Sequence, residues 1–344
     1  MWAERVIERI TKRKLKEQIG PEAGEERFAL YITARQALVG DILPSIARML
    51  PAHTDHGSEH VSSVLDNAAL LLGLEDINAE EYPTDLSGLE LHCLILSILF
   101  HDVGNIFGRE DHQHKVAEIY DLVRPSIQKQ RQERKILLQI TSAHCGDDSD
   151  GSRDTLKDLI GSIQLDRRQI RICEIAAILR FADELEEGPQ RTSLVMQQYH
   201  QYPRQSEVFH RYSDITNVHI DRGTNRIALT YDLNIDTNGS RQLSGDNEAK
   251  LRDLLGFTYI RIRKLNQERK YAKHYCTMLA PFTETTVVFD FSVDNRPHHF
   301  GFPRAVLLTD LVVPGDVEKE FPEYCGDFVI DNVIEKIRSG LQSV

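Results

Sequence analysis

The chain has 344 residues, of which 41% are hydrophobic and 27% charged, so it has enough apolar material for the cores of two globular domains. Its formal net charge of -12 argues against a protein that grips long nucleic acid through phosphate contacts alone, although a small phosphate ester held by a metal is compatible with it. The five cysteines are scattered without a CxxC pair, which indicates neither a disulfide framework nor a zinc knuckle and fits a reducing cytoplasm.

The first half of the chain has the hydrophobic periodicity of helices. Apolar residues such as Val61, Val64 and Leu65 recur at three or four positions, which is typical of a helix that faces a core. We expect helices over residues 2–18, 25–50, 54–74, 86–103, 113–123, 126–145, 156–163 and 168–186. The longest apolar run, residues 91–100, is interrupted by His92 and is too short to span a bilayer. We therefore expect neither a membrane segment nor a signal peptide.

The pattern changes after Gly188, where short runs of strand-forming residues begin. Residues 218–220 and 227–233 flank Gly223 and predict a hairpin. We expect further strands over residues 274–279, 285–293 and 305–312, and helices over residues 246–273 and 327–341. The predicted fold class is therefore α+β, with N-terminal helices in residues 1–50, an all-α helical bundle in residues 51–190 and a smaller mixed α+β domain in residues 191–344.

The most informative stretch is LELHCLILSILFHDVGN, residues 89–105. An apolar helix ends there on adjacent His101 and Asp102, and Gly104 is expected to take the left-handed conformation that terminates a helix. An imidazole and a carboxylate together suit a divalent metal of intermediate hardness. Side chains of the same kinds stand before and after this pair, at His53, His56, His60, His112, His114, His144 and Asp183.

This order of His, His-Asp, His, His and Asp resembles the HD superfamily of metal-dependent phosphohydrolases, over about residues 55–191. The resemblance implies an HD-domain bundle in which one divalent ion is held by His60, His101, Asp102 and Asp183. Some branches of the family bind a second ion, which here would lie between a bridging Asp102 and the imidazoles of His112 and His144. His114 stays open as an alternative to His112. One or two ions are expected, with Mn, Fe, Mg, Ni and Zn all compatible.

Asp183 also has a physical argument of its own. It lies in the apolar stretch LRFAD, where an ionised carboxylate is rarely buried without a cation or hydrogen-bond partners. A metal is one such partner, and Arg180, three residues away on the same helix face, is another. The acids that follow, Glu186 and Glu187 among them, are expected to form a solvated helix end.

Two positions in the loop after the His-Asp pair are predicted to bind substrate. Asn105 stands where many catalytic members of the family carry lysine, so it can hydrogen-bond a phosphate but supplies no charge. Arg109 is the nearest cation in the same loop and is expected to supply that charge, with Lys115 as the next candidate.

These residues predict an enzyme that hydrolyses a phosphate ester or phosphoanhydride with a metal-activated water. By family analogy the substrate is a small phosphorylated molecule, a nucleotide or cyclic nucleotide. Asp102 would hold or bridge the metal, and His56 or His114 would protonate the leaving oxygen.

Two other functions stay open at this point. One is a metal-dependent nuclease acting on single-stranded nucleic acid. The other is a degenerate HD scaffold whose α+β part serves as a regulatory or interaction module in bacterial signalling or defence. A homo-oligomer or a protein partner is compatible with each of them, and no membrane partner is expected.

Overall fold

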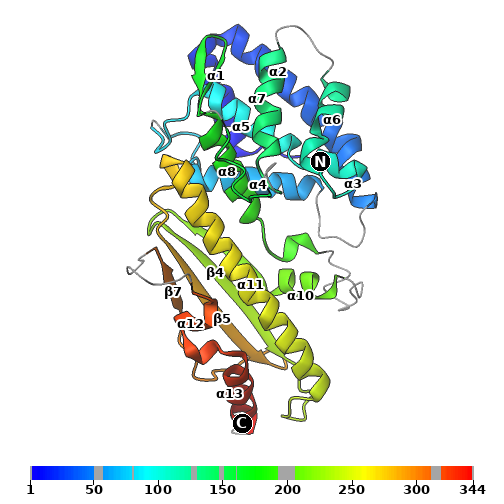
Figure 1. Ribbon diagram of the computed structural model, residues 1–344, viewed down its shortest axis with the longest axis vertical. Helices are drawn as coiled ribbons and strands as arrows, with labels where there is room; N and C mark the ends of the chain where they lie inside the picture. The colour runs from blue at the N-terminus through cyan, green and yellow to red at the C-terminus, as the bar shows by residue number, and fades with distance from the viewer. Residues whose placement is uncertain are drawn as a thin grey trace. The chain divides into compact units, whose positions relative to one another are not determined.

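The computed structural model describes residues 2–49, 57–79, 81–124, 130–146, 151–159, 161–192, 206–310 and 319–342. The chain divides into two compact units (Figure 1). Unit 1 comprises residues 1–186 together with 271–280, and unit 2 comprises residues 187–270 together with 281–344. Helices and two small sheets are both present, so the chain is of the mixed α and β class that the sequence predicts. The expected domain boundaries at residues 50 and 190 stay a prediction.

Unit 1 begins with two helices that pack against each other. α1 (Val6–Ile19) and α2 (Pro21–Ala37) are separated only by Gly20, whose φ of 94° allows the chain to turn between them. α2 begins earlier than predicted, because the fixed φ of Pro21 suits the first position of a helix. It continues into a π-helical turn, η1 (Leu38–Ile42), and then into α3 (Leu43–Met49).

Three helices carry, or lead directly into, the side chains that the sequence predicts to bind the first metal ion: α4 (Ser58–Leu72), α5 (Gly88–Phe100) and α8 (Ile172–Glu184) (Figure 1). Every residue of α5 is buried, because α1, α4, α7 and α8 all pack against it. The segment Gly88–Phe107 is long and apolar enough to cross a membrane by length and composition, but 94% of it is buried inside the structure. Its apolarity is accounted for by its place in the core.

The chain after α5 is helical rather than a plain loop. Two short 3-10 helices follow it and lead into two further α-helices: η2 (Val103–Phe107), η3 (His112–His114), α6 (Val116–Val123) and α7 (Arg131–Ser142). The left-handed conformation predicted for Gly104 is wrong, since its φ is not positive. Glycine is required there for another reason: a Cβ would lie 1.9 Å from the carbonyl oxygen of His112. Gly104 thus lets η2 and η3 approach each other.

The expectation of an all-helical first half is wrong in one place. Residues 155–159 form turns instead of the predicted helix, and β1 (Ile163–Leu165) pairs with β2 (Arg168–Ile170) in an antiparallel hairpin. Asp166 and Arg167 make its turn with φ of 51° and 63°. Two-residue turns of this kind usually carry Asn or Gly, so the sequence holds no clear signal for this one.

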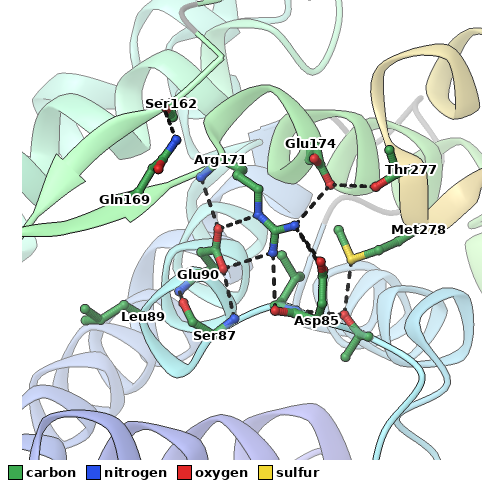
Figure 2. Close-up of polar contacts among 12 residues, drawn as sticks. Asp85, Ser87, Leu89, Glu90, Ser162, Gln169, Arg171, Glu174, Thr277 and Met278 are labelled. Atoms are coloured by element: carbon green, nitrogen blue, oxygen red, sulfur yellow. Dashed lines mark hydrogen bonds and ion pairs between the residues drawn. The ribbon is translucent and has the colours of Figure 1, made fainter.

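Arg171 ties the start of α8 to the start of α5 (Figure 2). Its Nε donates a hydrogen bond of 2.8 Å to the Glu90 carboxylate, which also accepts one of 2.9 Å from the backbone N–H of Ser87 in the capping box that begins α5. Glu90 lies eleven positions before His101, and Arg171 lies twelve positions before Asp183. The two helices therefore begin at this ion pair, and each is 13 residues long.

Unit 2 is built on a sheet in which β4 and β5 are central. Its main elements are α10 (Glu207–Ile215), β3 (Thr216–Asp221), β4 (Arg226–Ile235), α11 (Gly245–Tyr275), β5 (Glu284–Val293), β6 (Arg296–Pro297), β7 (Val306–Thr309), α12 (Phe321–Tyr324) and α13 (Ile330–Gln342). The last five residues of α11, from Tyr271 on, belong to unit 1. The strand order is β3-β4-β5-β6, with β7 also paired to β5. β3 and β4 form the predicted hairpin, whereas β4 and β5, which α11 connects, pair in parallel. The predicted strand over residues 274–279 is wrong, because α11 continues to Tyr275 and a 3-10 turn, η6 (Thr277–Leu279), follows.

One face of this sheet forms the core of unit 2. Alternate residues of β4 and β5 are buried, and the rings of Tyr231 and Phe289 stack with centroids 5.1 Å apart. Tyr259 of α11 meets Phe289 edge-on at 6.2 Å, so the helix covers this apolar face.

Candidate metal centre

Side chains from the ends of three helices converge in unit 1. His60 is the third residue of α4, His101 and Asp102 directly follow α5, and Asp183 stands in the last turn of α8. Asp102 has φ of -105° and ψ of 0°, so the backbone has left the helical region at this residue. Its carboxylate can therefore point to the same place as the imidazole before it.

We call His60, His101, Asp102 and Asp183 cluster 1. The Nε2 atom of His60 lies 3.2 Å from Nε2 of His101, 3.3 Å from Oδ1 of Asp183 and 3.5 Å from Oδ2 of Asp102. The Nε2 atom of His101 lies 3.5 Å from Asp183 Oδ1 and 3.6 Å from Asp102 Oδ2. Asp183, with 26% of its side chain exposed, is the most open of the four. Four potential ligand atoms thus surround one point in a largely buried site.

A second group, which we call cluster 2, consists of His112, His144 and Cys145. Their potential ligand atoms all lie within 4.8 Å of one another. Asp102 joins the two clusters, since its other oxygen, Oδ1, lies 3.0 Å from Nε2 of His112 and 3.7 Å from Nε2 of His144. Asp102 therefore presents one carboxylate oxygen to each cluster.

All four imidazoles are oriented by a contact at Nδ1. In His101, His112 and His144 this atom faces the backbone carbonyl three residues earlier, at 2.7, 3.1 and 2.6 Å. His60 is the third residue of its helix, and the carbonyl three residues earlier, that of Gly57, accepts from the N–H of Val61. The Nδ1 atom of His60 faces the Glu186 carboxylate at 2.9 Å instead. An Nδ1–H that donates to oxygen leaves the lone pair on Nε2, which is the form that binds metals. Every Nε2 atom of the two clusters therefore has a lone pair that can bind a proton or a metal ion.

Cluster 1 is consequently a set of acceptors that face one another and require positive charge. Burial opposes protonation, but the carboxylates of Asp102, Asp183 and Glu186, which accept hydrogen bonds from the protonated imidazole, raise the pKa of His60 well above its ordinary value. Burial likewise opposes ionisation of Asp183, yet the facing His101 and His60 hold the pKa of that carboxyl well below its ordinary value. In cluster 2, burial lowers the pKa of His144, but the nearby Cys145 and Asp102 have the larger opposite effect and raise this pKa to about 9. Protons or a divalent cation can supply the missing charge.

The spacing of the donor atoms fits a metal ion. Nitrogen and oxygen ligands lie about 2.0–2.2 Å from zinc, so two of them at angles between 90° and tetrahedral are about 2.9–3.6 Å apart. The contacts within cluster 1, 3.2–3.6 Å, fall in that range. Imidazole and carboxylate together suit several first-row divalent ions. These His and Asp groups can therefore bind a metal ion.

Comparison with known proteins agrees with this geometry. A family model described as HD-CE matches residues 50–264, more than half of the chain. The chain belongs to the HD-CE family. The match bears out the resemblance to an HD-type family, and it includes every residue of both clusters. Neither the comparison with curated proteins nor that with solved structures found a match.

The structure of this HD-CE protein also places the other predicted site residues. His56 lies outside the described residues. His114 is exposed at the end of η3, so the histidine that joins cluster 2 is His112. Arg109 is exposed too, and its backbone carbonyl is the oxygen that faces His112. Asn105 is fully buried in η2, and neither its amide nitrogen nor its amide oxygen has a hydrogen-bond partner within the described part of the chain.

Two residues of the HD-CE site were missed by the sequence analysis. The predicted solvated helix end is wrong, because Glu186 is only 1% exposed and orients His60. Its position three residues after Asp183 was the available signal, since such spacing places two side chains on one helix face. Cys145 was missed because cysteines were sought in CxxC pairs, whereas this one directly follows a histidine. Arg180, the competing partner of Asp183, donates to Thr155 at 2.8 Å.

Proposed function

We propose that this HD-CE protein is a metal-dependent hydrolase that cleaves a phosphate ester or phosphoanhydride bond in a nucleotide or cyclic nucleotide. The observation that carries the proposal is the position of Asp102, whose two oxygens face two clusters of imidazoles with fixed ring orientations. Two ions joined in this way are typical of enzymes that transfer or hydrolyse phosphoryl groups. We assign the site to an HD-type helical domain in residues 51–190, which a mixed α+β domain in residues 191–344 follows.

The chemistry is divided between the ions and the chain. When bound, divalent ions supply Lewis acidity, which polarises a phosphoryl oxygen and makes water more acidic. The chain holds its imidazoles in the tautomer that binds metal, and Glu186 increases the basicity of Nε2 of His60 by accepting from its Nδ1–H. Burial of the ligands keeps bulk water from competing with substrate oxygens. The residues thus provide orientation and a preformed electrostatic site.

Charge explains why an acidic protein can bind a phosphate here. The two carboxylates of cluster 1, Asp102 and Asp183, carry two negative charges when ionised, and one divalent ion only neutralises them. A second divalent ion adds two more positive charges at the point where a phosphate oxygen would bind, so the ions can hold a phosphate there in spite of the overall charge of -12. We therefore propose that the active form holds two ions.

Asn105 is our candidate for a direct contact with the phosphoryl group. A buried amide without partners costs about 1–3 kcal/mol, and a substrate oxygen accepting from its N–H would remove part of that cost. Asn105 follows the bridging Asp102 by three positions, and Arg109 in the next loop offers the charge that an amide lacks. For protonation of the leaving oxygen we propose His114, whose exposed imidazole follows His112 by two positions.

The proposal is tested by metal analysis and turnover of the full chain. We expect purified protein to bind metal and to hydrolyse at least one member of a nucleotide and cyclic-nucleotide panel with Mn²⁺, Mg²⁺, Ni²⁺ or Fe²⁺. Asp102→Ala should lose the second ion and nearly all turnover. The matched control is Asp121→Ala, because Asp121 is an exposed acid that pairs with Arg134 at 2.7 Å and belongs to neither cluster.

Three results would contradict the proposal. Unchanged hydrolysis in Asp102→Ala would show that the clusters are not the active site. Bound metal without turnover on any nucleotide would favour a degenerate scaffold with a regulatory role. Cleavage of single-stranded nucleic acid that weakens steeply with salt would favour a nuclease.

A further inference from the structure

Cluster 2 contains a sulfur atom whose position is that of a metal ligand. Cys145 Sγ lies 3.6 Å from Nε2 of His112, which in turn lies 3.0 Å from Oδ1 of Asp102. With a zinc–sulfur distance of about 2.3 Å and a zinc–nitrogen distance of about 2.0–2.1 Å, a tetrahedral angle separates the two ligand atoms by about 3.6 Å. The sulfur thus lies in one group with the nitrogens of His112 and His144, and Oδ1 of Asp102 faces the same two nitrogens.

The local backbone holds this cysteine in place. His144 and Cys145 come just after α7, and Gly146 turns the chain with a φ of 83° that side-chain-bearing residues rarely adopt. A Cβ on Gly146 would lie 2.7 Å from the side-chain amide of Gln113, the residue that directly follows His112 in η3. The turn therefore seats Cys145 against the segment that carries the other histidine of the cluster.

The other four cysteines lack these surroundings. Cys93 and Cys276 are buried, and burial raises the pKa of both thiols. Cys173 is half-buried in unit 1, as Cys145 is, but its sulfur faces the carbonyl of Leu156 at 3.8 Å. Cys325 is half-buried in unit 2. Among the described residues, Cys145 alone of the five belongs to a group that could hold a metal.

We propose that Cys145 is a thiolate ligand of the second ion, so that cluster 2 selects a thiophilic cation such as Zn²⁺ or Fe²⁺ while cluster 1, with nitrogen and oxygen only, accepts harder ions. Binding breaks the S–H bond, the sulfur lone pair forms the bond to the ion, and the proton leaves to solvent. Thiolates favour soft cations, and Mg²⁺ strongly prefers oxygen ligands. The two positions of the centre therefore hold different ions when both kinds are present. This inference deepens the proposed function and rests on its metal centre.

The test compares the wild-type chain with Cys145→Ser, and Cys173→Ser is the matched control, since it makes the same change at a half-buried cysteine of the same unit. Each metal-free protein is titrated with Co²⁺ while the near-ultraviolet sulfur-to-cobalt charge-transfer band is recorded. We expect two ions per chain and the band in wild type and Cys173→Ser. In Cys145→Ser the band should be absent and the second ion bound at least tenfold more weakly.

A second measurement needs no variant and so does not depend on the folding of Cys145→Ser. X-ray absorption of the zinc-loaded wild type should show one sulfur for two zincs, at about 2.3 Å. A band that persists in Cys145→Ser, or two bound zincs without a sulfur neighbour, would overturn the thiolate assignment while leaving the proposed function standing. A wild-type chain that binds no metal at all would overturn both.

Discussion

Replacement of Glu186 by glutamine isolates the role of the carboxylate behind His60. The Nδ1 atom of His60 lies 2.9 Å from Glu186 Oε2, and Glu186 is 1% exposed, so water cannot take its place. Glutamine keeps the size and can still accept from the imidazole N–H, but it removes the negative charge. The substitution therefore changes one property of one contact.

The size of the effect follows from the kind of hydrogen bond that is lost. Bonds to charged groups contribute about 1.5–3 kcal/mol and neutral ones about 0.5–1.5 kcal/mol, which leaves a difference of about 1–1.5 kcal/mol. Since 1.4 kcal/mol corresponds to a factor of ten, Glu186→Gln should weaken binding of the cluster 1 ion roughly tenfold. That value lies at the lower end of the range of about 10–100-fold known for partners of metal-binding histidines.

Competition with a chromophoric chelator measures this change directly. The matched control is Glu184→Gln, the same substitution at a half-buried acid two residues earlier that belongs to neither cluster. In the metal-free protein, Glu186→Gln should also lower the pKa of His60, because Glu186 is one of the groups that raise it. Equal metal affinities in the two variants, with an unchanged His60 titration by NMR, would refute the role given to Glu186.

Two further predictions concern cluster 2 and its support. The pKa of His144 rises from 6.5 to about 9 on folding, so its contribution to the stability of the metal-free protein is complete below pH 6.5 and is lost as the pH rises towards 9. Urea unfolding across this range should show the free energy of unfolding falling by at most about 3.4 kcal/mol. The apparent metal affinity should rise by up to about tenfold per pH unit over the same range, and a flat profile of both quantities would contradict the assignment. Gly104→Ala should displace His112, because the new Cβ would lie 1.9 Å from its carbonyl oxygen, and the metal content should fall from two ions to one. Gly40→Ala, where a Cβ meets nothing within 4 Å, is the control, and equal metal content in both variants would show that η3 is not held through Gly104.

The elements that local pattern specifies were predictable. α4, α5 and α8 are regular helices with apolar periodicity, and the hairpin of β3 and β4 has a glycine-containing turn between alternating strands. The β1–β2 hairpin was not predicted, because Asp166 and Arg167 occupy a left-handed turn that glycine or asparagine normally fills. The parallel pairing of β4 and β5 was not predicted, because a helix of 31 residues separates the two strands in the sequence and no local pattern indicates which strands pair.

For the site, the amino-acid sequence by itself determined the kinds and the order of the candidate metal ligands, because each stands at a helix end that local periodicity marks. Tertiary packing alone decided which of them meet. It brought His60 and Glu186 together across 126 positions, chose His112 over His114, and placed a cysteine beside the second pair of histidines. The physical reason is that helix formation depends on neighbours three and four residues away, whereas a metal site depends on where the ends of separate helices come to rest.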